Sequence, residues 1–277
     1  MAEQPQGNTS LSAVVADIAT GVVLALDGGH DSYALSGVLA QDDPVALAAI
    51  RVLGADVLAP YAPAADTTSS RAAGRGDATR PGGAGLADEA IVRKALAAYP
   101  PAADASDVSV WSYRGLVEAS RAFLPGSSGA GGYGAGGYGA GGYGAGHSVG
   151  GSGDGGQDGR PAEPQAGTDW LYSDPWPKLA HRASQLGALS LPGLAPAIAD
   201  GLTARTEDLA RGFVRAVRRR DWLQAAGIGR WLARVPDVPD SLGLDTGLVY
   251  VLRMSGGDPR VALHAAVARR FYGRGAR

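Results

Sequence analysis

One segment of the chain limits the folds available to the rest, because it is too rich in glycine to form a packed core. Between Gly126 and Gly167 the pentapeptide GGYGA occurs three times in succession, at 131–135, 136–140 and 141–145. Glycine loses more conformational freedom on folding than any other residue and has no side chain to bury. We therefore predict a disordered Gly/Tyr-rich linker at 126–167 that joins two domains, 1–125 and 168–277.

Two short patterns in this segment have the spelling of functional motifs. Residues 146–150 read GHSVG, which matches the GxSxG of a nucleophile elbow, and residues 129–134 match the GxGxxG of a phosphate-binding loop. An elbow needs a strand before its serine and a helix after it, and a phosphate loop needs the same frame. Glycine repeats supply neither, so we interpret both matches as chance and predict no nucleophile at Ser148.

The composition excludes several classes of site. The chain has no cysteine, so it has no disulfide, cysteine-bound zinc or cysteine nucleophile. Lysine contributes only Lys94 and Lys178 among 25 basic residues, a bias typical of a GC-rich bacterial genome. No basic residue precedes Arg51, and charges interrupt every long apolar run. We therefore expect a cytoplasmic protein with no secretion signal and no membrane span.

The spacing of apolar residues predicts a mainly α fold. From Leu11 to Leu26 they recur at helical intervals, after the capping candidates Thr9 and Ser10. Asp43 stands before Pro44, and Asp258 before Pro259, as an N-cap stands before a proline in the first helical turn.

Three segments share the pattern of an apolar helix, a polar turn and a second apolar helix. Asp43, Asp221 and Asp258 each lie in one of the turns. We predict helical hairpins or an irregular bundle. The short apolar runs GVVLAL, VSVW and LVYVLRM leave an α+β fold as the alternative, because periodicity does not separate a strand from a buried helix in so short a run.

The two halves differ in charge. Residues 1–167 hold nine basic and 17 acidic side chains, and residues 168–277 hold 16 basic and ten acidic. In the basic half, a helical wheel for 206–219 puts several arginines on the side opposite Leu209, Phe213 and Val217. Two tryptophans lie nearby in a proline-broken stretch. Our candidates for binding a partner or an anion are Arg211, Arg215, Arg218, Arg219, Arg220, Trp170 and Trp176.

No pattern indicates a metal or a cofactor. The cluster Asp27-Gly28-Gly29-His30-Asp31 resembles a helix C-terminus more than a metal site. His181 and His264 are isolated in the sequence. We predict neither a metal nor a cofactor.

These observations favour a non-catalytic adaptor or scaffold that binds a partner protein. An enzyme, or an auxiliary subunit of one, is the first alternative, and it requires a pocket that brings His181 or His264 close to carboxylates. Nucleic-acid binding through the C-terminal arginines is the less favoured alternative, and it requires an affinity that falls steeply with salt.

Overall fold

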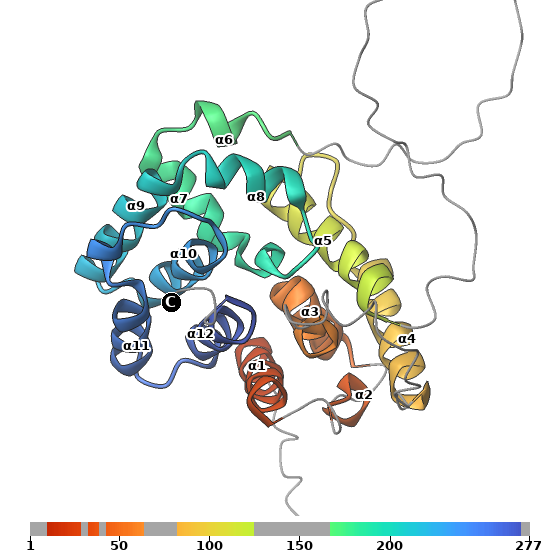
Figure 1. The fold of residues 1–277 in the computed structure, drawn as a ribbon. Helices are drawn as coiled ribbons and strands as arrows, with labels where there is room; N and C mark the ends of the chain where they lie inside the picture. Colours follow the sequence, from red (N-terminus) through yellow and green to blue (C-terminus); the bar gives the residue numbers. More distant parts are fainter. Residues whose placement is uncertain (1–9, 29–32, 39–42, 64–81, 125–166, 273–277) are drawn as a thin grey trace, which may run out of the picture.

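The protein is described by a computed structural model that covers residues 10–28, 33–38, 43–63, 82–124 and 167–272 (Figure 1). Within these residues the fold is mainly α, as predicted, and no strand occurs. The α-helices are α1 (Leu11–Gly28), α2 (Leu35–Val38), α3 (Pro44–Leu53), α4 (Gly82–Ala98), α5 (Asp107–Phe123), α6 (Trp170–Ser173), α7 (Trp176–Gln185), α8 (Pro196–Thr203), α9 (Thr206–Arg218), α10 (Trp222–Arg234), α11 (Leu244–Met254) and α12 (Pro259–Tyr272). Three 3-10 helices connect some of them: η2 (Gly54–Tyr61), η5 (Gly187–Ser190) and η6 (Asp240–Leu242).

The strand alternative is wrong for each segment that suggested it. GVVLAL lies in α1, VSVW in α5 and LVYVLRM in α11. All three runs belong to helices that bury one side, as the burial of Val22, Trp111 and Val251 shows. A buried helical face therefore accounts for apolar stretches that would also suit a strand.

The three turn aspartates each accept a hydrogen bond from a backbone N–H at the start of a helix. Asp43 accepts from Val45 at 2.9 Å, Asp221 from Gln224 at 3.2 Å, and Asp258 accepts from the N–H of Arg260 at 2.8 Å. These bonds satisfy donors that have no partner inside the helix.

Helix α10 lies at the centre of the C-terminal half. It packs against α7, α9, α11 and α12, and α12 packs in turn against α1 (Figure 1). Helix α1 also contacts α3 and η2, while α5 contacts η2. Through α12 and α1 the packing runs continuously from the C-terminal helices to the N-terminal ones.

Both hydrophobic cores draw on residues from the two predicted domains. The first consists mainly of residues from α1, α3, η2, α4 and α5, and it also contains Leu263, Val267 and Phe271 of α12. The second consists mainly of residues from α6 to α12, and it also contains Trp111 of α5. The division into two domains stays a prediction, and residues 126–166 of the linker lie outside the described part of the chain.

Two segments, 11–28 and 44–61, are long and apolar enough to cross a membrane by length and composition alone. Their mean hydropathies are 1.7 and 1.4, and 39% and 61% of their residues are buried inside the protein. In the fold, α1 packs against α3 and α12. We expected no membrane span because charges interrupt these runs, whereas length and composition allow a span in each segment. The cytoplasmic location stays a prediction.

Helices α7 and α10 approach each other closely at Gly227. A Cβ atom on Gly227 would lie 2.6 Å from the carbonyl oxygen of Ser184 and 3.0 Å from its Cα atom. Both are backbone atoms, so a side chain at this position would force the two helices apart. By contrast, nothing lies within 4 Å of the position that a Cβ atom on Gly21 of α1 would take.

We predict that Gly227→Ala lowers the free energy of unfolding by about 2 kcal/mol, because overpacking a tight contact shifts the backbone. The matched variant Gly21→Ala should raise the free energy of unfolding by up to ~1 kcal/mol, since alanine stabilises a helix more than glycine does where its side chain meets no other atom. Urea unfolding followed by circular dichroism measures both. Equal shifts in the two variants would contradict this account of the contact between α7 and α10.

Candidate functional site

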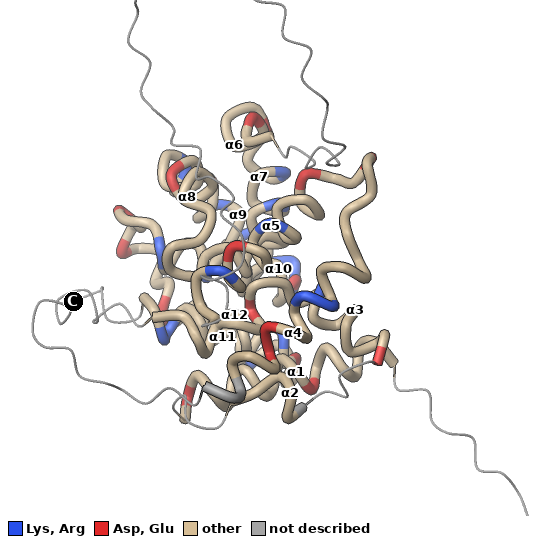
Figure 2. The backbone as a smooth tube through the Cα atoms, turned by 90° about the vertical axis from the view of Figure 1, so that its right-hand side faces the viewer, with Lys and Arg blue, Asp and Glu red and all other residues tan. Residues whose placement is uncertain are grey.

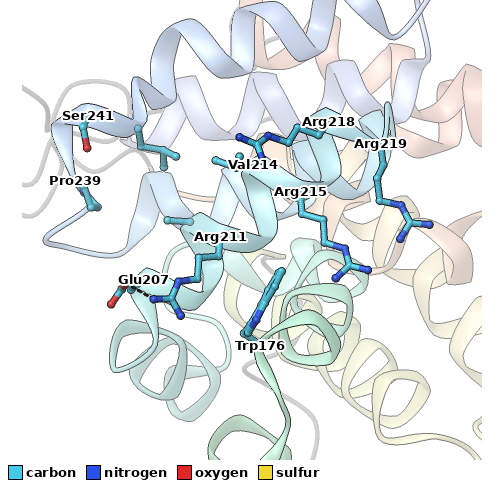
Figure 3. A pocket seen from close by; sticks show the side chains of 11 residues that line it. Trp176, Glu207, Arg211, Val214, Arg215, Arg218, Arg219, Pro239 and Ser241 are labelled. Atoms are coloured by element: carbon cyan, nitrogen blue, oxygen red, sulfur yellow. Dashed lines mark hydrogen bonds and ion pairs between the residues drawn. The ribbon is translucent and has the colours of Figure 1, made fainter.

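Four of the predicted arginines line one groove on the outer side of α9. Its other walls are Trp176 of α7 and the segment from Pro239 to Leu242, and its volume is about 790 Å³. Figure 3 shows Arg215 beside the Trp176 ring and Arg211 turned towards Glu207. The arginines that line the groove are Arg211, Arg215, Arg218 and Arg219.

The surface between the arginines is apolar. Ala210 and Val214 lie on the same side of α9 as the arginines, and Leu242 contributes from η6. Val214 is 36% exposed, although Phe213 beside it is buried in the core. The groove therefore combines guanidinium groups with accessible aliphatic surface.

The arginines of the groove differ in what they contact. Arg211 forms an ion pair with Glu207 at 2.6 Å, whereas the guanidinium of Arg215 lies 5.5 Å from the centre of the Trp176 ring. Among the described residues, no carboxylate lies within 4.0 Å of Arg215, Arg218 or Arg219. Figure 2 shows that charged residues occur on both halves of the described chain. The groove differs from these other charged positions because three neighbouring arginines line it without an acidic partner among the described residues.

Two of the predicted site residues lie elsewhere. Arg220 is exposed in the turn after α9, where its φ of 58° places it in the left-handed region, and it does not line the groove. Trp170 is only 4% exposed and belongs to the second core, with the guanidinium of Arg182 5.6 Å from its ring centre. Trp170 therefore lies in the core, away from any surface a partner could reach.

A buried polar cluster surrounds Arg230 of α10, a residue with no exposed surface. Its Nη2 lies 2.7 Å from Oδ1 of Asp56 in η2. Its Nε donates to Oγ of Ser190 in η5 at 2.5 Å, and its Nη1 lies 3.3 Å from Nδ1 of His264 in α12. One guanidinium therefore connects four separate helices, including η2 from the N-terminal half.

Arg230 fixes the protonation of His264. Arginine can only donate hydrogen bonds, so Nδ1 of His264 is the acceptor and the proton of the neutral ring is on Nε2. Burial and the adjacent positive charge of Arg230 lower the pKa of His264 from 6.5 to about 4. Arg260 lowers it further, whereas Asp56 and Asp258 raise it. The ring is therefore neutral near pH 7.

A cavity of about 280 Å³ reaches this cluster. It brings together His181, His264, Asp56 and Asp221, which are far apart in the sequence. The enzyme alternative expects a histidine and carboxylates in one pocket, and this cavity has two of each in its lining; the alternative itself stays a prediction. A smaller hollow of about 220 Å³ lies between this cavity and the groove. It shares His181, Asp221 and Gln224 with the cavity, and Trp176, Arg215 and Arg219 with the groove.

Sequence reasoning missed Arg230, Asp56 and Ser190, although two of them carry a signal. Arg230 stands beside Trp231 on the side of α10 that is otherwise apolar, and Asp56 interrupts the apolar run GADVLAP. One basic and one acidic residue, each alone within an apolar stretch, indicate a buried ion pair. Of the cluster at 27–31, only Asp27 and Gly28 are described, and no group of three or more metal-ligating residues occurs in the described part of the chain.

Comparison of the chain with family models, with curated proteins and with solved structures found no match.

We predict that His264 makes the protein less stable in acid. Its pKa is about 4 in the folded protein against 6.5 ordinarily. Between these values the unfolded chain binds a proton that the folded protein excludes, so stability falls as the pH falls through this window. From pH 7 to pH 5 the loss from this residue should be about 2 kcal/mol.

The variant His264→Asn removes the imidazole but keeps an acceptor for Arg230, so it should lose about 2 kcal/mol less than the wild type between pH 7 and pH 5. The control His181→Asn changes an exposed ring and should behave like the wild type. Urea unfolding at the two pH values measures these differences. The same pH dependence in His264→Asn and wild type would show that His264 is not held neutral.

Proposed function

We propose that the protein is a non-catalytic interaction protein of the bacterial cytoplasm, and that the groove on α9 binds an acidic segment of a partner protein. One observation carries the proposal: Arg215, Arg218 and Arg219 line an accessible apolar groove and have no acidic partner among the described residues. A guanidinium binds a carboxylate through two parallel hydrogen bonds. A row of such groups therefore favours a partner that supplies several carboxylates.

The apolar floor defines the partner further. Val214 and Leu242 offer aliphatic surface between the guanidinium groups, and Trp176 closes one end. Arginine and tryptophan are also the residues that most often dominate the energy of protein interfaces. An acidic segment with interspersed apolar side chains would satisfy both parts of this surface. The volume of about 790 Å³ is within the range of pockets that hold ligands.

A protein segment fits this groove better than a nucleic acid does. Glu207 lines the groove and Asp208 lies 3.7 Å from Arg211, and these carboxylates would repel a phosphate and a peptide carboxylate alike. The accessible aliphatic floor separates the two classes of partner, because it has a complement in apolar side chains and none in a phosphate backbone. Nucleic-acid binding is kept as an outcome of the experiment.

The probe is a short fluorescein-labelled peptide in which Glu and Leu alternate, and binding is followed by fluorescence anisotropy. The double variant Arg215→Gln/Arg219→Gln should bind it at least about ten-fold more weakly, because each hydrogen bond between charged groups contributes about 1.5 to 3 kcal/mol. The control Arg253→Gln/Arg269→Gln removes the same charge from exposed positions outside the groove and should bind like the wild type.

Two further probes separate the alternatives. A peptide with Gln in place of Glu should not bind, and a labelled oligonucleotide should bind more weakly than the acidic peptide at the same salt concentration. Equal affinity of the groove variant and the control variant for the acidic peptide would overturn the proposal. Tighter binding of the oligonucleotide, lost in Arg215→Gln/Arg219→Gln, would assign the groove to nucleic acid.

A further inference from the structure

The hollow between the groove and the cavity holds more positive than negative charge. Its charged and polar lining residues are His181 of α7, Arg215 and Arg219 of α9, and Asp221 and Gln224 at the start of α10. The remaining lining is apolar and comes from α7 and α9. Two guanidinium groups and an imidazole share the hollow with one carboxylate, so its charge favours an anion.

The two arginines reach the hollow from the same side of α9. They are four positions apart, and residues at this spacing are neighbours on the surface of a helix. Figure 3 shows the side chains of Arg215 and Arg219 extending in the same direction, whereas that of Arg218 extends in another. One anion can therefore contact both guanidinium groups.

His181 adds a donor from the opposite wall. Its ring is exposed, and its Nδ1 lies 3.5 Å from Oε1 of Gln224, beyond the usual range of about 2.7 to 3.2 Å for an N–H···O bond. An imidazole donates through one nitrogen when neutral and through both when charged. The ring can therefore turn an N–H towards an anion without losing a strong hydrogen bond.

Asp221 is the acidic residue of the hollow, and it is engaged in the backbone. Its Oδ1 accepts from the N–H of Gln224 at 3.2 Å and so caps α10. Among the described residues, neither Asp221 nor another carboxylate lies within 4.0 Å of Arg215 or Arg219. The carboxylate therefore weakens the attraction for an anion but does not occupy the guanidinium groups.

The size of the hollow limits what can enter it. Its volume of about 220 Å³ is about seven times the ~30 Å³ share of one water molecule, and it lies below the range of pockets that hold drug-sized ligands. The two helical walls are held close, because a Cβ atom on Gly212 of α9 would overlap that of Ala180 in α7. The hollow therefore suits one anionic group of a larger partner.

We propose that the hollow binds a phosphate group, which the acidic segment proposed for the groove carries on a phosphorylated side chain. The inference rests on the proposed function, because the hollow shares Trp176, Arg215 and Arg219 with the groove. A phosphorylated side chain has a charge of about −1.5 to −2 at pH 7 and three acceptor oxygens. It can accept from both guanidinium groups and from His181 together, whereas a carboxylate has only two oxygens.

The hollow lies towards the end of α9 that is far from the acidic residues of this helix. Glu207 and Asp208 are in its first turn, whereas the residues of α9 that line the hollow lie between Gly212 and Arg219. One side chain of the partner can enter the hollow while the rest of the segment covers the apolar floor of the groove. A phosphate held there avoids the repulsion of the two carboxylates.

The probes are versions of the fluorescein-labelled peptide of alternating Glu and Leu in which phosphoserine replaces one Glu, at each acidic position in turn. Their binding to the full chain is followed by fluorescence anisotropy and compared with that of the parent peptide. At one position or more, phosphoserine should raise the affinity about ten-fold, because its phosphate forms additional hydrogen bonds with charged donors.

Three variants place the phosphate through the ratio of the two affinities. His181→Ala changes the hollow and not the groove, and it should lower the ratio at least about three-fold. Arg218→Gln changes the groove and not the hollow, so it should weaken both peptides and keep the ratio of the wild type. Asp221→Asn should raise the ratio, because it removes a repelling charge and asparagine caps a helix as well as aspartate does.

Inorganic phosphate separates a phosphorylated segment from a free phosphate compound. It should displace the phosphoserine peptide only at concentrations far above that of the peptide. Displacement at equal concentrations would assign the hollow to a free compound and overturn the proposal. The same conclusion would follow if phosphoserine gave no gain at any position, or if His181→Ala and Asp221→Asn left the gain unchanged.

The two proposals fail in different ways. If the parent peptide binds at the groove and phosphoserine adds nothing, only the phosphate site is wrong. If the phosphoserine peptide binds with the expected pattern of variants and the parent peptide does not bind, the phosphate site stands and the groove does not recognise carboxylates. If neither peptide binds, both proposals are wrong.

Discussion

The packing of the described helices depends on one buried guanidinium. Arg230 has no exposed surface, and it contacts Asp56 of η2, Ser190 of η5 and His264 of α12. Removing a charge of this kind from water is costly, and only partners held close to it offset that cost. Losing one member of such a pair typically costs about 3 to 5 kcal/mol, because the other charge stays buried alone. The protein is therefore stable only when η2 lies close enough to α10 for Asp56 and Arg230 to form their ion pair.

The two candidate sites are built around the same helix. Helix α10 packs against α9, which carries the groove arginines, and against α7, which supplies Trp176. Its own Leu223 and Gln224 line the cavity, together with His264 of α12. Close contacts at Gly227 leave α7 little freedom to move relative to α10. The groove and the cavity are thus separate surfaces formed by α10 and the helices that pack tightly against it. The hollow at His181 lies between these two surfaces.

Local signals in the sequence were enough for the helices, their aspartate caps and the arginine face of α9, because each depends on residues within a few positions of one another. Trp170 was misplaced, since exposure of an aromatic side chain depends on which distant helices cover it. Arg230 and Asp56 were missed for a related reason: they are 174 positions apart, and only the fold brings them together. The three short apolar runs in α1, α5 and α11 fit a strand or a helix equally until their packing is known.

Because Arg230 joins η2 to α10 and α12, we expect residues on both sides of the glycine-rich segment to unfold as one cooperative unit, and not as the two separate domains predicted from the sequence. Amide hydrogen exchange across a series of urea concentrations, read by mass spectrometry on the full chain, tests it most directly. The account predicts that peptides from α1 and α3 lose protection in the same transition as peptides from α10 and α12. Loss of protection in α1 and α3 at distinctly lower urea, with α10 and α12 still protected, would contradict it.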